Sequence, residues 1–255
     1  MMPSAADLVL PLVMAAAAGL VGSIAVMRRM TLAPDAISHV ALPGIGAAVL
    51  LRINPVLGGV VALLFGTLLV WALEHKTRIP TEAIIGVVFS AALAVGSMLA
   101  SGEDLMEALF GAPRRAGRAE ILVGLATAAI VIAFILQARS RLVLTLVSPD
   151  LARTAGVAVG RLNLIFLLAF ALTVALGLRY LGVLLMGSLI IIPAATAKHL
   201  ARSLSAMQAL AVAIAMVSTL VGSLAAPVLH REAGPLIITA AALIFFGSLA
   251  RRGAD

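Results

Sequence analysis

Long apolar runs occupy most of this chain, and each is long enough, or nearly so, to cross about 30 Å of hydrocarbon. Backbone N–H and C=O groups find no water inside a bilayer, so only helices and closed barrels can span it. Barrel strands alternate apolar and polar residues, whereas these runs are continuous and rich in Ala and Leu. We therefore expect an all-α polytopic integral membrane protein with eight or nine transmembrane helices, over residues 8–27, 35–51, 55–73, 82–100, 119–138, 162–178, 181–197, 206–229 and 235–250.

The composition agrees with a lipid environment. Hydrophobic residues make up 63% of the chain and charged residues 11%, against about 25% charged residues in a soluble domain. The net charge of +7 could suggest nucleic acid, but the Arg residues stand singly or in pairs at the ends of apolar runs. That distribution is typical of helix-end anchors, so we expect a bilayer around the chain and no nucleic-acid partner. The chain has no cysteine, which excludes disulfides and thiolate metal sites.

The basic residues also predict an orientation. The first seven residues lack Lys and Arg, so we interpret the run 8–27 as the first transmembrane helix and not as a secretory signal. An N-terminus outside and a C-terminus inside places two thirds of the 18 Lys and Arg residues on the cytoplasmic side, as the positive-inside rule requires. The inside set is Arg28, Arg29, Lys76, Arg78, Arg139, Arg141, Arg153, Arg161, Lys198, Arg202, Arg251 and Arg252.

The second run carries chemistry, because it begins with two ionisable residues spaced four apart, Asp35 and His39. On a helix this spacing places both side chains on one face. A carboxylate oxygen and an imidazole nitrogen are ligands for Zn²⁺ or Mn²⁺. The plainer alternative is that Asp35 is an acid at a helix start, stabilised by the helix dipole, with His39 packed beside it. A centrally placed Asp costs roughly 2.5–3.5 kcal/mol on insertion scales, which favours a functional partner such as a bound cation.

The same run contains Pro43 and Gly44, and it is short for a span. We expect this pair to break the helix and free backbone carbonyls, as happens where backbone lines a cavity. A re-entrant or broken segment here would leave eight spans and an inside N-terminus.

Three blocks resemble the zinc/manganese/iron ABC permease family of the ABC-3 type. The first is DAISHVALPGIGAAVLL at 35–51, which is similar to the family pattern D-x-x-S-H-x-x-L-P-G. The second is TEAIIGVVFSAALAVG at 81–96, and the third extends from 148 to 197 and ends in LIIIPAATA. Together they cover most of the chain in the family order, so residues 1–255 are expected to form a single permease domain.

The resemblance implies a homodimer in the cytoplasmic (inner) membrane of a bacterium, with cytoplasmic ABC ATPase subunits and an extracytoplasmic metal-binding protein. The chain itself has no G-x-x-x-x-G-K-S/T sequence, so ATP hydrolysis needs a separate subunit and the chain is expected not to be an enzyme. The resemblance also implies that a short helix in the loop of about 140–161 couples to the ATPase. The residues concerned are Ser148, Pro149, Asp150, Ala152 and Gly156.

The expected function is import of a divalent metal, Zn²⁺ or Mn²⁺ and after them Fe²⁺, as cargo and not as a permanently bound cofactor. Two copies would offer two Asp and two His, enough for four-coordinate Zn²⁺; alternatively each Asp35–His39 pair binds with help from Ser38, a carbonyl or water. An ion-coupled secondary transporter is the alternative function. Weaker candidates are Ser38, Pro43, Gly44, Ser188 and Thr196 as pathway-lining residues, His230 and Glu232 for metal entry, and the acidic stretch Glu103, Asp104 and Glu107.

Overall fold

The computed structural model describes residues 5–30, 33–77, 79–99, 117–178 and 182–252. These ranges contain helices and no strand, which confirms the all-α prediction. The helices are α1 (Ala5–Met27), α2 (Ala33–His39), α3 (Ala41–Leu50), α4 (Pro55–Lys76), α5 (Thr81–Leu99), α7 (Arg118–Val147), α8 (Pro149–Thr154), α9 (Val159–Leu178), α10 (Gly182–Leu200), α11 (Leu204–Leu229) and α12 (Ala233–Arg252).

Seven helices of the described part are long and apolar enough to cross a membrane: α1, α4, α5, α7, α9, α11 and α12. Two shorter apolar stretches, 36–50 and 185–200, correspond to α2 with α3 and to most of α10. Each predicted apolar run therefore has a helical counterpart. The two short ones fall on the predicted runs 35–51 and 181–197.

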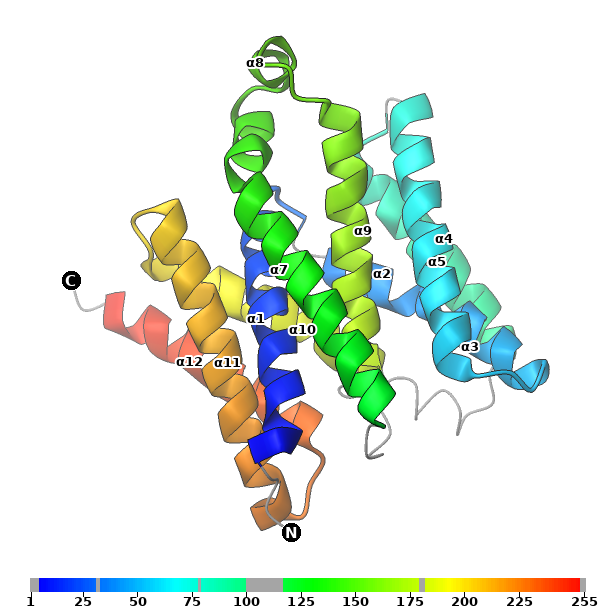
Figure 1. Cartoon of the computed structure of the whole chain (residues 1–255), viewed down its shortest axis with the longest axis vertical. Coiled ribbons are helices and arrows are strands. Elements are labelled where there is room, and N and C mark those ends of the chain that lie inside the picture. The colour runs from blue at the N-terminus through cyan, green and yellow to red at the C-terminus, as the bar shows by residue number, and fades with distance from the viewer. Residues whose placement is uncertain (1–4, 31–32, 78, 100–116, 179–181, 253–255) are drawn as a thin grey trace.

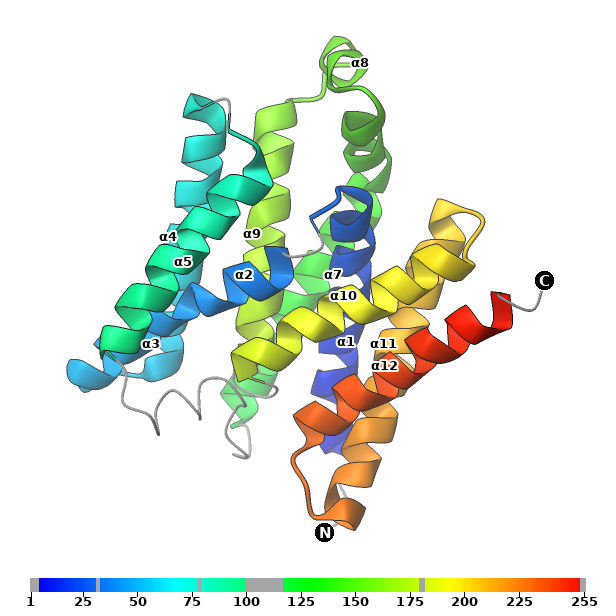
Figure 2. The ribbon, with the colours of Figure 1, turned by 180° about the vertical axis from the view of Figure 1, so that it is seen from behind.

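The helices form two groups (Figures 1 and 2). Helices α1, α7, α10, α11 and α12 pack together in one group, and α3, α4 and α5 in the other. Helix α9 contacts both α7 and α4, and α2 contacts both α10 and α5. We call the boundary that α2 and α9 occupy the seam. The short helix α2 thus lies between the two groups and not on the outside of either.

One end of the molecule carries α8 (Figure 1), and several basic residues lie at this end. Helices α1, α4 and α7 all run toward this end, while α9 runs away from it. Arg28, Arg29 and Arg153 line one cavity there, and Lys76 ends α4. These four belong to the predicted inside set, so the structure gathers them as that prediction requires. That the α8 end faces the cytoplasm stays a prediction.

The connection predicted at 139–161 is shorter than expected. Helix α7 continues through Arg139 and Arg141 to Val147, so only residues 148–158 connect it to α9. An apolar run ends where the lipid ends, but a helix can continue into water because Arg and Leu are good helix formers. The predicted start of the 140–161 loop was therefore about two helical turns too early.

Helix α1 is the centre of the larger group. Of its apolar window, 72% is buried within the chain, against 17–44% for the other six long helices of the described ranges. Small residues permit this. A Cβ on Gly19 would lie 2.7 Å from the Ala211 carbonyl oxygen, and one on Gly22 would lie 2.0 Å from the Ile190 carbonyl oxygen. The backbones of α1, α10 and α11 therefore approach closely, as small residues allow in membranes.

We expect Gly22→Ala to destabilise the fold by about 1–3 kcal/mol, because the added methyl group meets the backbone of α10 and not a movable side chain. Thermal unfolding of the detergent-purified chain would measure this. Gly86→Ala is the matched control, since a Cβ there meets nothing within 4 Å. Equal melting temperatures for the two variants would contradict the close approach of α1 and α10.

Candidate functional site

The second apolar run folds as two short helices that meet at Val40. Helix α2 ends at His39, and α3 begins at Ala41. The prediction that Pro43 and Gly44 break the helix was wrong in its position, because both residues lie inside α3. Proline lacks an N–H and its ring clashes with the carbonyl four residues earlier, which is that of His39. The break therefore comes before Pro43. This residue lies in the first turn of α3, where a backbone N–H would have no intrahelical acceptor, so the helix loses no hydrogen bond there.

His39 lies at the end of α2, inside the seam. Its ring is half-buried and meets the Phe89 ring of α5 edge to face, with centroids 5.4 Å apart and an interplanar angle of 80°. The neighbouring Ser38 is fully buried. Asp35 belongs to the same helix, one turn earlier, and its side chain lies outside the described residues. The structure thus places the backbone of the predicted pair on one short helix between the two groups.

Gly44 has a packing role that the sequence did not show. A Cβ on Gly44 would lie 2.1 Å from the Gly58 carbonyl oxygen, and one on Gly58 would lie 2.2 Å from that of Gly44. The α3 and α4 backbones therefore meet at these two glycines. A pathway-lining role for Pro43 and Gly44 stays a prediction.

Ser188 and Thr196 both lie on α10, which packs against α2. Ser188 is half-buried. Thr196 is buried and donates its hydroxyl hydrogen to the Ile192 carbonyl at 2.8 Å, one turn back on its own helix. The hydrogen bond of Thr196 is internal to α10 and does not indicate a pathway. The pathway-lining role of Ser188 and Thr196 stays a prediction.

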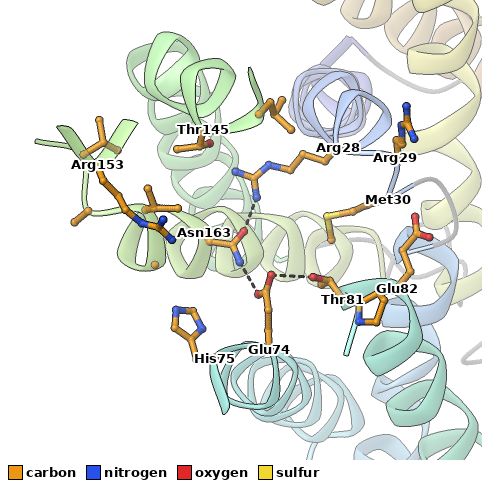
Figure 3. Close-up of a pocket in the computed structure, with 16 residues that line it drawn as sticks. Arg28, Arg29, Met30, Glu74, His75, Thr81, Glu82, Thr145, Arg153 and Asn163 are labelled. Atoms are coloured by element: carbon orange, nitrogen blue, oxygen red, sulfur yellow. Dashed lines mark hydrogen bonds between the residues drawn. The ribbon is translucent and has the colours of Figure 1, made fainter. Parts of the chain in front are cut away.

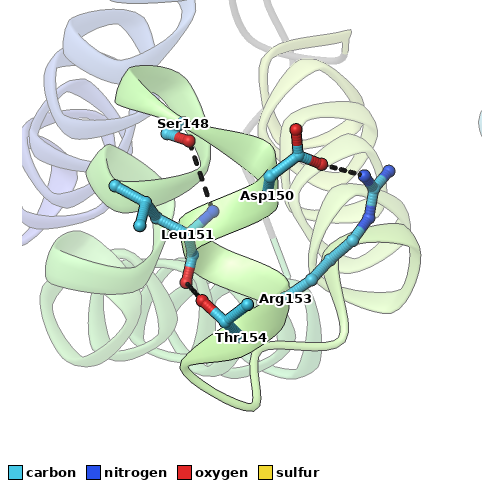
Figure 4. A network of polar contacts seen from close by, with 5 residues as sticks. All are labelled: Ser148, Asp150, Leu151, Arg153 and Thr154. Carbon is cyan, nitrogen blue, oxygen red and sulfur yellow. Dashed lines mark hydrogen bonds and ion pairs between the residues drawn. The ribbon is translucent and has the colours of Figure 1, made fainter.

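The predicted short helix in the loop before α9 is confirmed as α8 (Figure 4). Pro149 begins it, and the Ser148 side chain caps it by accepting a hydrogen bond from the Leu151 amide at 3.2 Å. Such a cap stabilises a helix start by about 1 kcal/mol. Asp150 and Arg153 form an exposed ion pair at 2.7 Å. Exposed pairs of this kind contribute little to stability. Both side chains are largely exposed, so they are accessible to another molecule.

Gly156 ends α8 in a left-handed conformation, with φ of +77°. The Val157 amide donates to the Ala152 carbonyl at 2.9 Å, and the Gly156 amide donates to that of Arg153 at 3.0 Å. This pair of bonds is the Schellman arrangement that glycine favours. Ala152 is fully buried, so it anchors α8 on the chain while the other face remains exposed.

The remaining acidic and histidine candidates lie elsewhere. His230 ends α11 with φ of 50°, and both it and Glu232 are exposed in the connection to α12, at the end opposite α8. Glu103, Asp104 and Glu107 lie outside the described residues. Within the described ranges no three His, Asp or Glu side chains come together as a metal site would require.

The structure also contains a polar network that the sequence analysis missed (Figure 3). Arg28, directly after α1, donates to the Asn163 side-chain oxygen on α9. The Asn163 amide nitrogen donates to Glu74 of α4 at 2.6 Å, and the Thr81 hydroxyl donates to the same carboxylate at 2.8 Å. Burial lowers the pKa of the Arg28 guanidinium to about 10, against the raising effect of Glu74. Arg28 therefore keeps its charge at neutral pH.

A cavity of about 790 Å³ adjoins this network at the α8 end. Met30, Thr145 and Arg153 line it together with the network residues. The only sequence signal for the network was an unpaired acid, Glu74, near the end of a very apolar helix. Asn163 is 89 positions from Glu74 and 135 positions from Arg28 in the sequence, and no local pattern reveals such contacts.

Comparison with known proteins identifies the family. A family model described as the ABC 3 transport family matches residues 4–252. The chain belongs to this family. Its members are membrane components of transport systems, so the chain is a permease that spans the membrane several times and is not an enzyme. The resemblance found in the three sequence blocks is therefore confirmed.

Two relatives of this ABC 3 permease cover nearly its whole length. The high-affinity zinc uptake system membrane protein ZnuB of Haemophilus influenzae is 31% identical over 91% of this chain and 90% of its own. The manganese transport system membrane protein MntC of Listeria monocytogenes is 30% identical over 89% and 83%. Among solved structures, PsaBC from Streptococcus pneumoniae in complex with Fab matches with a TM-score of 0.80 and 26% identity, over 94% of this chain and 88% of that one.

Gly156→Val should loosen α8, because a β-branched residue in the left-handed region costs roughly 1–2 kcal/mol. We expect hydrogen exchange at the Val157 amide to become about 5- to 30-fold faster, the factor that this free energy represents. Gly156→Asn is the control, since Asn tolerates this conformation, and should exchange nearly as the parent does. Equal protection in both variants would show that the glycine is not required for the end of α8.

Proposed function

We propose that this chain is the transmembrane permease subunit of an ATP-driven importer for a divalent metal ion, Zn²⁺ or Mn²⁺, with Fe²⁺ as a further candidate. The observation that carries the proposal is α2. It is a helix of seven residues that ends at His39 and lies between two helix groups, and it bears Asp35 one turn before. Ionisable residues in a membrane segment mark ion pathways.

The identity of the cargo is supported by ligand chemistry and by the relatives. An imidazole nitrogen and a carboxylate oxygen suit both Zn²⁺ and Mn²⁺, so the ligand types alone do not separate the two. The relatives named above are described as a zinc uptake protein and a manganese transport protein. Both lines of support agree on a divalent cation of this kind.

A second copy of the chain would complete the site. Two copies that meet along a shared pathway would contribute Asp35 and His39 twice, which gives the four donors that Zn²⁺ takes. The described part of one chain brings together no set of three such groups. We therefore place a homodimer in the proposed importer, and we leave Ser38 as a further oxygen donor for each copy.

Helix α8 is the proposed contact for a cytoplasmic ATPase. It projects from one end of the molecule (Figure 1) and presents exposed Leu151 beside the Asp150–Arg153 pair. The ATP-binding loop sequence is missing from the chain, so the energy comes through such a partner. The opposite end, with exposed His230 and Glu232, would receive the metal from an extracytoplasmic binding protein. This arrangement belongs in the cytoplasmic membrane of a bacterium.

We expect Asp35→Ala and His39→Ala each to reduce ATP-dependent metal uptake at least about tenfold, because each variant removes one donor from the site. Uptake of Zn²⁺ and Mn²⁺ would be measured in vesicles that contain the chain with its ATPase. His199→Ala, in the last turn of α10, is the matched control and should transport as the parent does. Uptake that is unchanged in both site variants would remove the proposed metal site.

A further inference from the structure

The polar network of Arg28, Asn163, Glu74 and Thr81 crosses the seam at the end that carries α8. Arg28 follows α1, which belongs to the larger helix group, and Glu74 and Thr81 belong to α4 and α5 of the smaller group. Asn163 lies between them on α9 (Figure 3). The network therefore connects the two groups along the same boundary that holds α2.

Asn163 is the central link, because an amide side chain is both an acceptor and a donor. Its oxygen accepts from Arg28, and its nitrogen donates to Glu74. A positive and a negative side chain thus satisfy each other through one neutral residue. Hydrogen bonds to charged groups are among the stronger ones in proteins.

The two arms of the network are not equally secured. On the smaller-group side, α4 is tied to α9 a second time, since Trp71 donates its indole N–H to the Gly160 carbonyl at 3.1 Å. On the other side, the Arg28 side chain contacts α9 through Asn163 and through the Phe166 ring one turn further on, 4.4 Å from the guanidinium carbon. The Arg28 Nε is buried and has no hydrogen-bond partner among the described residues. Because α9 also packs against α1, α7 and α10, a separation between Arg28 and α9 would be local to the α8 end.

The cavity lies where such a separation would have an effect. It opens at the α8 end and is lined by residues that follow α1, by the ends of α4 and α7, by the starts of α5 and α9, and by Arg153 of α8. Met30, which also lines it, is buried and precedes α2 by only a few residues. A movement of α8 would thus reach the network and Met30 through one shared space.

We propose that the network of Arg28, Asn163, Glu74 and Thr81 is a latch that holds the α8 end of the seam closed, and that it must open before an ion can leave α2 toward that end. This inference rests on the proposed function for the ion that would pass. The opening of the latch itself does not depend on that function. While it is closed, the positive Arg28 guanidinium also stands in that path, and positive groups exclude cations from pores.

The absence of native cysteines permits a direct test of opening. Met30→Cys introduces a single thiol into the cavity of the full-length chain, and its reaction rate with a water-soluble maleimide in nanodiscs reports how far the α8 end is open. Adding Asn163→Ala removes both hydrogen bonds of the amide and should speed labelling about tenfold or more, the factor that one hydrogen bond to a charged group represents.

Two further variants make the comparison specific. Thr145→Ala changes a side chain that lines the same cavity but bonds only within α7, to the Leu142 carbonyl, and it should label as the parent does. Asn163→Leu keeps a side chain of similar size while removing both the acceptor for Arg28 and the donor to Glu74, so it should also label faster. This second variant tests the latch even where Asn163→Ala fails to fold.

Labelling rates in the Asn163 variants that equal the rate in Thr145→Ala would overturn the latch. The result is independent of the metal site, because His39→Ala leaves the network intact and should not alter labelling of Cys at position 30. Fast labelling in the Asn163 variants, together with normal metal uptake in His39→Ala, would support the latch and contradict the proposed function. Slow labelling in the Asn163 variants, together with lost metal uptake in His39→Ala, would support the proposed function and contradict the latch.

Discussion

Close contact between helix backbones is the constraint on which the rest of this structure depends. Lipid tails are as apolar as the side chains they touch, so helices in a bilayer associate through packing and not through a hydrophobic difference. Gly19 and Gly22 let α1 reach the backbones of α11 and α10. Gly44 and Gly58 do the same for α3 and α4 in the smaller group. Because α10 is fixed against α1, it gives α2 a firm surface on one side, and α5 completes the other.

The seam between the two groups holds both features that concern transport. Near the middle it holds α2, whose helix ends early because a proline follows four residues after His39. At the α8 end it holds the network of Arg28, Asn163, Glu74 and Thr81 beside a cavity. In the proposed importer, movement at this one boundary would thus affect both ion binding at α2 and ion release at the α8 end. Helix α8, the proposed ATPase contact, lines that cavity through Arg153, which gives a physical route from that contact to the latch.

The proposed metal site on α2 has few ligands per copy, and release of a transported ion gives a reason for this. A structural zinc site is closed by four strong donors, whereas an ion that must be released is better served by donors that can separate. A site shared between two copies, as proposed, would assemble and come apart with the dimer pathway. Phe89, in edge contact with the His39 ring, would then hold that ring in place when the metal is absent.

The sequence by itself determined the all-α membrane class, the family, the short helix α8 and the place of Asp35 and His39 on one helix. These follow from local signals: continuous apolar runs, Pro149 and Gly156 around α8, and a spacing of four. It could not locate the helix break, because Pro43 acts on the carbonyl four residues earlier, nor the end of α7, which outlasts its apolar run. Only the tertiary structure decided that Arg28, Glu74 and Asn163 form one network. Residues 89 and 135 positions apart meet only when the helices pack, and that packing depends on which small residues face each other.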